Sequence, residues 1–98
     1  MTFQLKFAAE ADANLADLEN DRSQIAELRA VRKCLAYLES NPKHPSLQTH
    51  EFHSIKGPRG EKVFEAYAQN RTPNAFRVLW RYGPGKRIIT IMAIFPHP

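Results

Sequence analysis

Residues 76–81 read Phe-Arg-Val-Leu-Trp-Arg, and this stretch decides the fold that we expect. Side chains alternate between the two faces of a sheet along a strand, so Phe76, Val78 and Trp80 would share one face. Both arginines would share the opposite face, roughly 13 Å apart at a rise of ~3.3 Å per residue. The apolar row needs a covering layer of helices, whereas the arginine row suits an open face. The stretch therefore predicts a strand in a sheet that is covered on one face only.

The segments around this strand have the same two-residue period, and turns rich in glycine, proline and asparagine separate them. On the preceding segment, Phe64, Ala66 and Ala68 form the natural core set. Glu65 and Tyr67 would then lie on the same open face as the arginines. The expected elements are a strand over 47–54, a basic loop over 55–61, and strands over 62–69, 75–82 and 87–95.

The first forty residues instead predict one strand and a helical hairpin. Residues 2–7 alternate polar with apolar side chains, and residues 8–19 are alanine-rich with apolar side chains at helical spacing. Asn20 and Asp21 are cap-type residues that interrupt the helix, and a second, longer helix ends before Pro42. The expected fold class is α+β, with an N-terminal strand and two helices that pack on an antiparallel sheet (β-α-α-β-β-β-β).

The composition limits the class of protein. A chain of 98 residues, 43% of them hydrophobic, suits one compact domain over 1–98. No apolar run approaches the ~20 residues that span a bilayer, and no signal-peptide pattern is visible, so we expect a cytoplasmic protein without membrane contact. Cys34 is the only cysteine, and its place within an apolar helical stripe predicts a buried side chain rather than a nucleophile. His50 and His53 would point to opposite faces of a strand, so we expect no metal site.

The charge is unevenly distributed along the chain. Residues 1–40 contain five basic and seven acidic side chains, whereas residues 41–98 contain nine basic and three acidic ones. The net charge of +4 therefore conceals a strongly basic C-terminal part, which suits contact with phosphate groups or with an acidic protein segment. A cationic surface that serves only solubility is the alternative.

Short motifs spread over nearly the whole chain are similar to those of one protein family. They are Asn41-Pro42-Lys43-His44-Pro45-Ser46-Leu47, His50, Gly57, Phe64-Glu65-Ala66-Tyr67, Phe76-Arg77-Val78-Leu79-Trp80-Arg81 and Ile89-Thr90-Ile91-Met92-Ala93-Ile94. Together with the order of the expected elements, they resemble the RelE/ParE toxin superfamily. The resemblance implies the toxin of a type II toxin–antitoxin pair, with a cognate antitoxin as its partner. RelE-like members cleave messenger RNA in the ribosome, whereas ParE-like members inhibit DNA gyrase without a comparable nuclease site.

The resemblance also implies roles for individual residues. Arg77 occupies the position of the arginine that contacts the scissile phosphate in the cleaving members, and His97 lies near the place of their catalytic histidine. RelE itself has lysines on the preceding strand, where this chain has Glu65 and Tyr67. Cleavage of RNA without a metal or cofactor needs a base for the 2′-hydroxyl, a cation for the phosphate and an acid for the leaving oxygen. We expect Glu65, Arg77 and His97, respectively, in these three roles of an mRNA endonuclease.

Further residues are candidates for contact with RNA, and the candidates have structural alternatives. The RNA-binding candidates are Arg81, Tyr67, Lys56, Arg59 and Lys62. Glu65 and Arg77 could instead form a cross-strand ion pair without a catalytic role, and His97 could be a surface residue of the terminal tail. The alternatives in function are a ParE-like gyrase inhibitor and a non-toxic binding module that retains the fold.

Overall fold

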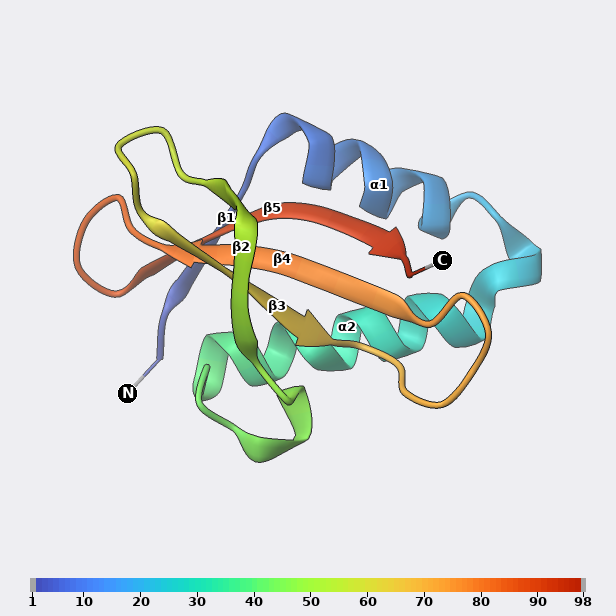
Figure 1. Ribbon diagram of the computed structural model, residues 1–98. Helices are drawn as coiled ribbons and strands as arrows, with labels where there is room; N and C mark the ends of the chain where they lie inside the picture. Colours follow the sequence, from blue (N-terminus) through green and yellow to red (C-terminus); the bar gives the residue numbers. More distant parts are fainter. Residues whose placement is uncertain (1, 98) are drawn as a thin grey trace.

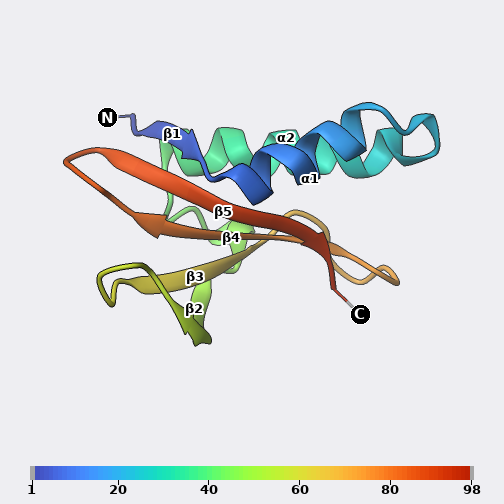
Figure 2. The ribbon, with the colours of Figure 1, turned by 90° about the horizontal axis from the view of Figure 1, so that it is seen from above.

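The computed structural model describes residues 2–97 and contains a five-stranded sheet with both long helices on the same face (Figure 1). Its elements are β1 (Gln4–Phe7), α1 (Ala9–Glu19), α2 (Ile25–Ser40), β2 (His50–Lys56), β3 (Lys62–Tyr67), β4 (Phe76–Tyr82) and β5 (Ile88–Pro96). Figure 2 shows the helices together on one side of the sheet, with β2 as the strand farthest from them. The expected α+β fold class is confirmed.

The direction of the first strand differs from the expectation of an antiparallel sheet. The strand order is β1-β5-β4-β3-β2, and β1 runs parallel to β5, with Leu5 opposite Ile89. The remaining neighbours are antiparallel, so the sheet is mixed. The prediction was wrong here because a two-residue period identifies a strand but carries no information about its partner or its direction.

The core lies between the helices and the covered face of the sheet. Phe76, Val78 and Trp80 on β4 are buried there, as their spacing predicted. The helices contribute one apolar stripe to the same cluster, in which Val31 and Leu38 are fully buried. β4 is therefore the strand whose alternation separates the apolar core from the polar face of the sheet.

Two short 3₁₀ turns lie at the ends of α2, and the second of them moves a boundary away from the sequence prediction. A turn at Arg22–Gln24 precedes α2, and the Asp21 side chain accepts a hydrogen bond from the Ser23 backbone N–H at 3.0 Å. A second turn at Pro45–Leu47 precedes β2, which therefore begins at His50 instead of residue 47. Leu47 belongs to the core cluster, so the chain turns there to bury this side chain before the strand begins.

The structure also bears on thiol chemistry, metal binding and membrane spanning. Burial raises the pKa of the Cys34 thiol to about 12, so at neutral pH this side chain is a buried thiol and not a nucleophilic thiolate. Within residues 2–97, no three histidine, cysteine, aspartate or glutamate side chains are grouped so as to hold a metal ion. No helix in this range has the length and apolar character that crossing a membrane requires.

Replacing Leu38 by alanine should lower the free energy of unfolding by about 2–5 kcal/mol, because the cavity left in a close-packed core fills only in part. The measurement is urea denaturation followed by circular dichroism. Ile25→Ala is the matched control, since this apolar side chain of the same helix is 49% exposed and its removal should cost less than about 1 kcal/mol. Equal losses in both variants would contradict the assignment of the core.

Candidate functional site

The candidate site lies on the helix-free face of the sheet, where the strand register brings polar residues of β2, β3 and β4 together. Tyr67 is opposite Arg77 across β3 and β4, and Glu65 is opposite His50 across β3 and β2. The placement of Glu65, Tyr67 and both arginines on one face agrees with their spacing in the sequence. The sequence also predicted that these side chains would be exposed. This prediction was wrong, because Glu65, Arg77 and Arg81 are only 5%, 8% and 9% exposed.

Arg81 is buried by the loop between β2 and β3. The Arg81 Nη1 atom lies 3.6 Å from Glu61 Oε2. A Cβ atom at Gly57 would lie 3.0 Å from Arg81 Cδ, so only glycine lets the loop backbone come this close to Arg81. The backbone N–H of Arg59 donates to Glu61 Oε1 at 2.8 Å. This bond, assisted by the nearby Arg81 and Arg59 charges, holds the pKa of Glu61 below its ordinary value. The expectation that Arg81 lies on an open face was wrong, because Arg81 is buried beneath this loop.

The basic loop carries less free positive charge than its sequence suggests. Lys56 Nζ lies 3.4 Å and Lys62 Nζ 3.9 Å from the Glu51 carboxylate, and His53 Nδ1 also lies 3.4 Å from it. Arg59 is exposed. Exposed pairs of this kind contribute little to stability, but they partly neutralise the loop as an attractor of phosphate.

Glu65 is paired with a histidine to which the sequence interpretation gave no role. His50 Nε2 lies 2.9 Å from Glu65 Oε1, and the two residues are directly opposite in the register. The His50 side chain is 49% exposed, whereas the Glu65 carboxylate is almost fully buried. The alternative of a cross-strand ion pair between Glu65 and Arg77 is wrong, because Glu65 pairs with His50 and Arg77 donates to the Gln69 carbonyl.

Tyr67 connects this pair to Arg77. The guanidinium carbon of Arg77 lies 3.7 Å from the centre of the Tyr67 ring, and the His50 ring meets that ring edge-on at 5.8 Å. Arg77 Nη1 donates to the backbone carbonyl of Gln69 at 2.8 Å, while Arg77 Nε has no hydrogen-bond partner among the described residues. We call Glu65, His50, Tyr67 and Arg77 the acid–base cluster.

His97 follows the last strand and lies close to this cluster in the ladder. Its backbone N–H donates to the Ala75 carbonyl at 2.8 Å, so it continues the pairing of β5 with β4 by one residue. Phe95 is opposite Arg77, which makes His97 the diagonal neighbour of Arg77 at about 7–8 Å between Cα atoms. The residue is exposed. The backbone of His97, one residue beyond β5, is therefore held beside β4 by this hydrogen bond.

Both ring nitrogens of His50 have an oxygen neighbour. Nε2 lies 2.9 Å from Glu65 Oε1, a separation that suits a hydrogen bond, and Nδ1 lies 3.4 Å from the Gln48 carbonyl. The cluster thus contains a half-exposed imidazole, a buried carboxylate beside it and a cation.

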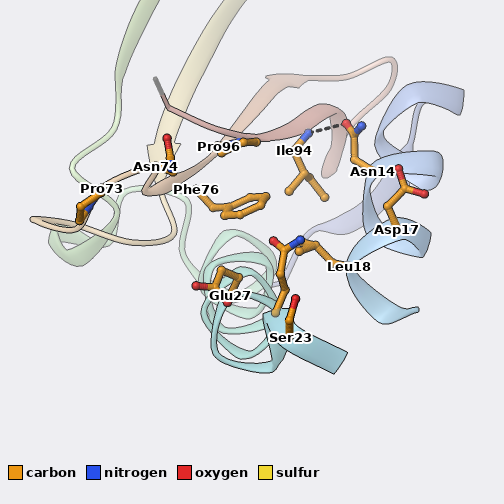
Figure 3. Close-up of a pocket in the computed structure, with 11 residues that line it drawn as sticks. Asn14, Asp17, Leu18, Ser23, Glu27, Pro73, Asn74, Phe76, Ile94 and Pro96 are labelled. Atoms are coloured by element: carbon orange, nitrogen blue, oxygen red, sulfur yellow. Dashed lines mark hydrogen bonds between the residues drawn. The ribbon is translucent and has the colours of Figure 1, made fainter. Parts of the chain in front are cut away.

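A pocket of about 470 Å³ lies on the helix-covered face of the sheet, between the two helices, the loop before β4 and the end of β5 (Figure 3). Asn14 Oδ1 accepts a hydrogen bond from the Ile94 backbone N–H at 2.9 Å there. Asp17 and Glu27 line it and no basic side chain does. Its negative charge makes it unsuited to a phosphate ligand.

The sequence contained one indication that His50 could face a carboxylate. The turn-containing segment 57–61 predicts a hairpin, and in a hairpin a histidine on the first strand can meet a carboxylate on the second. The register was not predictable, because β2 contains an irregularity between Glu51 and Lys56. Without the register, the sequence did not identify Glu65 as the partner of His50, and His50 was considered only as a metal ligand.

Comparison with solved structures relates this fold to toxins of toxin–antitoxin systems. The archaeal RelE–RelB complex from Pyrococcus horikoshii OT3 matches with a TM-score of 0.65 and 18% identity, covering 98% of this chain and 96% of that one. The YoeB/ParE toxin from Agrobacterium tumefaciens matches with a TM-score of 0.70 and 7% identity over 97% and 99%. The E. coli DinJ–YafQ complex matches with a TM-score of 0.68 and 10% identity over 99% and 94%. No protein-family model and no curated protein sequence matches the chain.

Replacing Glu61 by glutamine should destabilise the protein at neutral pH and reduce the acid sensitivity of its unfolding. The pKa of Glu61 is lower in the folded state, so the stabilisation is complete above the ordinary glutamate pKa of 4.5 and is lost as the pH falls below it. The measurement is the urea midpoint between pH 3 and pH 7. Glu39→Gln, at an exposed position on α2, is the control. An acid dependence in Glu61→Gln equal to that of the wild type would contradict the lowered pKa of Glu61 in the folded state.

Proposed function

We propose that this chain, which has the fold of the RelE/ParE toxin superfamily that its sequence predicted, is the toxin of a type II toxin–antitoxin pair and cleaves messenger RNA on the ribosome. The observation that carries the proposal is the acid–base cluster, in which Glu65 orients His50 at 2.9 Å beside Tyr67 and Arg77. Structural neighbours whose names describe toxins support the toxin role.

In this proposal His50 is the general base and Glu65 is its positioning residue. Glu65 is too deeply buried to reach a 2′-hydroxyl, whereas half of the His50 side chain is exposed. Nδ1 of His50 exchanges its 3.4 Å contact with the Gln48 carbonyl for the 2′-hydroxyl and removes its proton, and the 2′-oxygen attacks the adjacent phosphorus. The bond from phosphorus to the 5′-oxygen breaks, His97 donates a proton to that oxygen, and a 2′,3′-cyclic phosphate remains. No metal or cofactor takes part in these steps.

Arg77 and Tyr67 supply the electrostatics and the shape of the site. The buried guanidinium gives the face a positive potential that favours the charge developing on the phosphate. A direct contact requires Arg77 Nη1 to exchange the Gln69 carbonyl for a phosphate oxygen. Tyr67 holds the guanidinium against its ring and offers an aromatic surface to a nucleotide. Exposed Arg59 and the paired lysines Lys56 and Lys62 contribute weaker, screened attraction to the RNA backbone.

The proposed partner is a cognate antitoxin that covers the helix-free face. The name of the E. coli DinJ–YafQ structure describes a toxin–antitoxin complex, which supports a partner of this kind. The strongly basic part of this chain after residue 40 suits an acidic segment of such a partner. The partner would then block the acid–base cluster.

A ParE-like gyrase inhibitor is the second candidate, and one observation favours it. The Arg77 guanidinium is buried and donates to a backbone carbonyl, as a purely structural arginine would. In that case the cluster stabilises the sheet, and the target is recognised through another surface.

Replacing His50 by glutamine, Arg77 by alanine or His97 by alanine should each lower translation-dependent cleavage of a reporter message by about 10²–10⁴-fold. Glutamine at position 50 can still hydrogen-bond to Glu65 but cannot accept the proton at neutral pH. The measurement is primer extension on messages from a bacterial translation extract, with circular dichroism to verify folding.

His53→Gln is the matched control, because this histidine lies on the same strand, is 77% exposed and pairs only with Glu51 among the described residues. It should retain cleavage. Intact messages together with blocked supercoiling would favour the gyrase inhibitor, and harmless expression of the wild-type chain would favour a non-toxic binding module. Co-expression of the protein encoded by the neighbouring gene should relieve growth arrest if that protein is the antitoxin.

A further inference from the structure

A small cavity of about 160 Å³ lies between α2, the 3₁₀ turn at Pro45–Leu47 and the end of β3. The helix contributes Lys33 and Tyr37, the turn contributes Ser46, and β3 contributes Tyr67. We call it the lysine cavity. Pockets that hold whole small molecules start at roughly 300 Å³, so a cavity of this size suits a single charged group.

The polar side chains of the lysine cavity are hydrogen-bond donors that the described part of the chain leaves unused. Lys33 is exposed and has no carboxylate partner within residues 2–97, and its Nζ lies 5.9 Å from the centre of the Tyr37 ring. The hydroxyl groups of Tyr37, Ser46 and Tyr67 form no hydrogen bond in the same range. Ser46 is exposed and both tyrosines are partly exposed, so a ligand can reach these groups.

The charge of the lysine cavity favours an anion. No carboxylate side chain lines it, whereas an ammonium group and three hydroxyl groups can donate hydrogen bonds. Phosphate oxygens accept charge-assisted hydrogen bonds of this kind, and lysine is a common phosphate ligand. The pocket between the two helices contains Asp17 and Glu27 and would repel the same group.

The wall that carries Lys33 is held in place by contacts within the protein. The Tyr37 ring stacks on the His44 ring, with 4.1 Å between the ring centres and 20° between the planes. Nδ1 of His44 accepts a hydrogen bond from the Ser46 backbone N–H at 3.1 Å. These contacts connect α2 to the turn before any ligand binds, so little ordering is required on binding.

Tyr67 belongs to both the lysine cavity and the acid–base cluster. β2 begins at His50, opposite Glu65, so β3 has no β2 neighbour at Tyr67 and its edge is free there. The Arg77 guanidinium carbon lies 3.7 Å from the centre of the same tyrosine ring. A group held in the lysine cavity is therefore one side chain away from the cluster, around the free edge of β3.

We propose that the lysine cavity binds a phosphate group of the RNA strand, next to the phosphate that is cleaved. Lys33 pairs with the phosphate charge, and the hydroxyl groups donate to its oxygens. The strand passes from the acid–base cluster around the edge of β3 to α2. The identification of the ligand as RNA rests on the proposed function, whereas the affinity for a phosphate group does not.

The test measures the binding of a short fluorescein-labelled RNA by fluorescence anisotropy. All its 2′-hydroxyl groups are methylated, so it cannot be cleaved. Lys33→Gln should weaken binding about tenfold and reduce the slope of log affinity against log salt by about 0.7, the value for one phosphate contact on a single strand. Tyr37→Phe keeps the ring that stacks on His44 and should weaken binding about fivefold. Lys86→Gln, at an exposed position in the turn between β4 and β5, is the matched control and should bind as the wild type does.

Several results would overturn the inference. They are the absence of saturable RNA binding, equal affinities and salt slopes of Lys33→Gln and Lys86→Gln, and equal affinity of the wild type for a glutamate-rich peptide of the same charge. Saturable binding of inorganic phosphate that Lys33→Gln abolishes, without binding of the RNA, would assign the cavity to a small phosphorylated molecule. That result would overturn the assignment to RNA.

The binding assay and the cleavage assay can fail independently. Loss of cleavage in His50→Gln, together with equal RNA binding by Lys33→Gln and Lys86→Gln, would overturn only the role of the lysine cavity. Lys33-dependent RNA binding by a wild-type chain that leaves messages intact would overturn only the proposed cleavage of messenger RNA.

Discussion

Two guanidinium groups on the central strand β4 are buried on the face of the sheet that no helix covers, and a buried cation must be given partners. The strand alternation that places Trp80 in the core leaves no other side for these groups. The Tyr67 ring and the Gln69 carbonyl surround Arg77, and the Glu61 carboxylate approaches Arg81. The loops on either side of β3 are therefore shaped by the charges that they cover.

This constraint decides which side chains remain available to a ligand. The arginines contribute positive potential more than contact, because solvent reaches little of them. The half-exposed His50 ring becomes the accessible group of the acid–base cluster, with Glu65 as the buried support that fixes its orientation.

The candidate site was predictable in part. The alternation on β3 and β4 placed Glu65, Tyr67 and Arg77 on one face without any knowledge of the fold. It did not give their pairing, because the offset between two strands depends on turn geometry and on irregularities such as the one in β2. Glu65 therefore received the wrong partner, and His50 received none.

The sequence by itself determined the order of the elements, the covered face of β4 and the fold class, since these follow from local periodicity and from turn-forming residues. Only the tertiary structure decided the parallel pairing of β1 with β5, the burial of both arginines and the meeting of His50 with Glu65. Each of these depends on residues far apart in the chain or on loops that fold back over a strand. The spacing of residues in the sequence predicts which face of a strand a side chain is on, and it does not predict which residues contact that side chain.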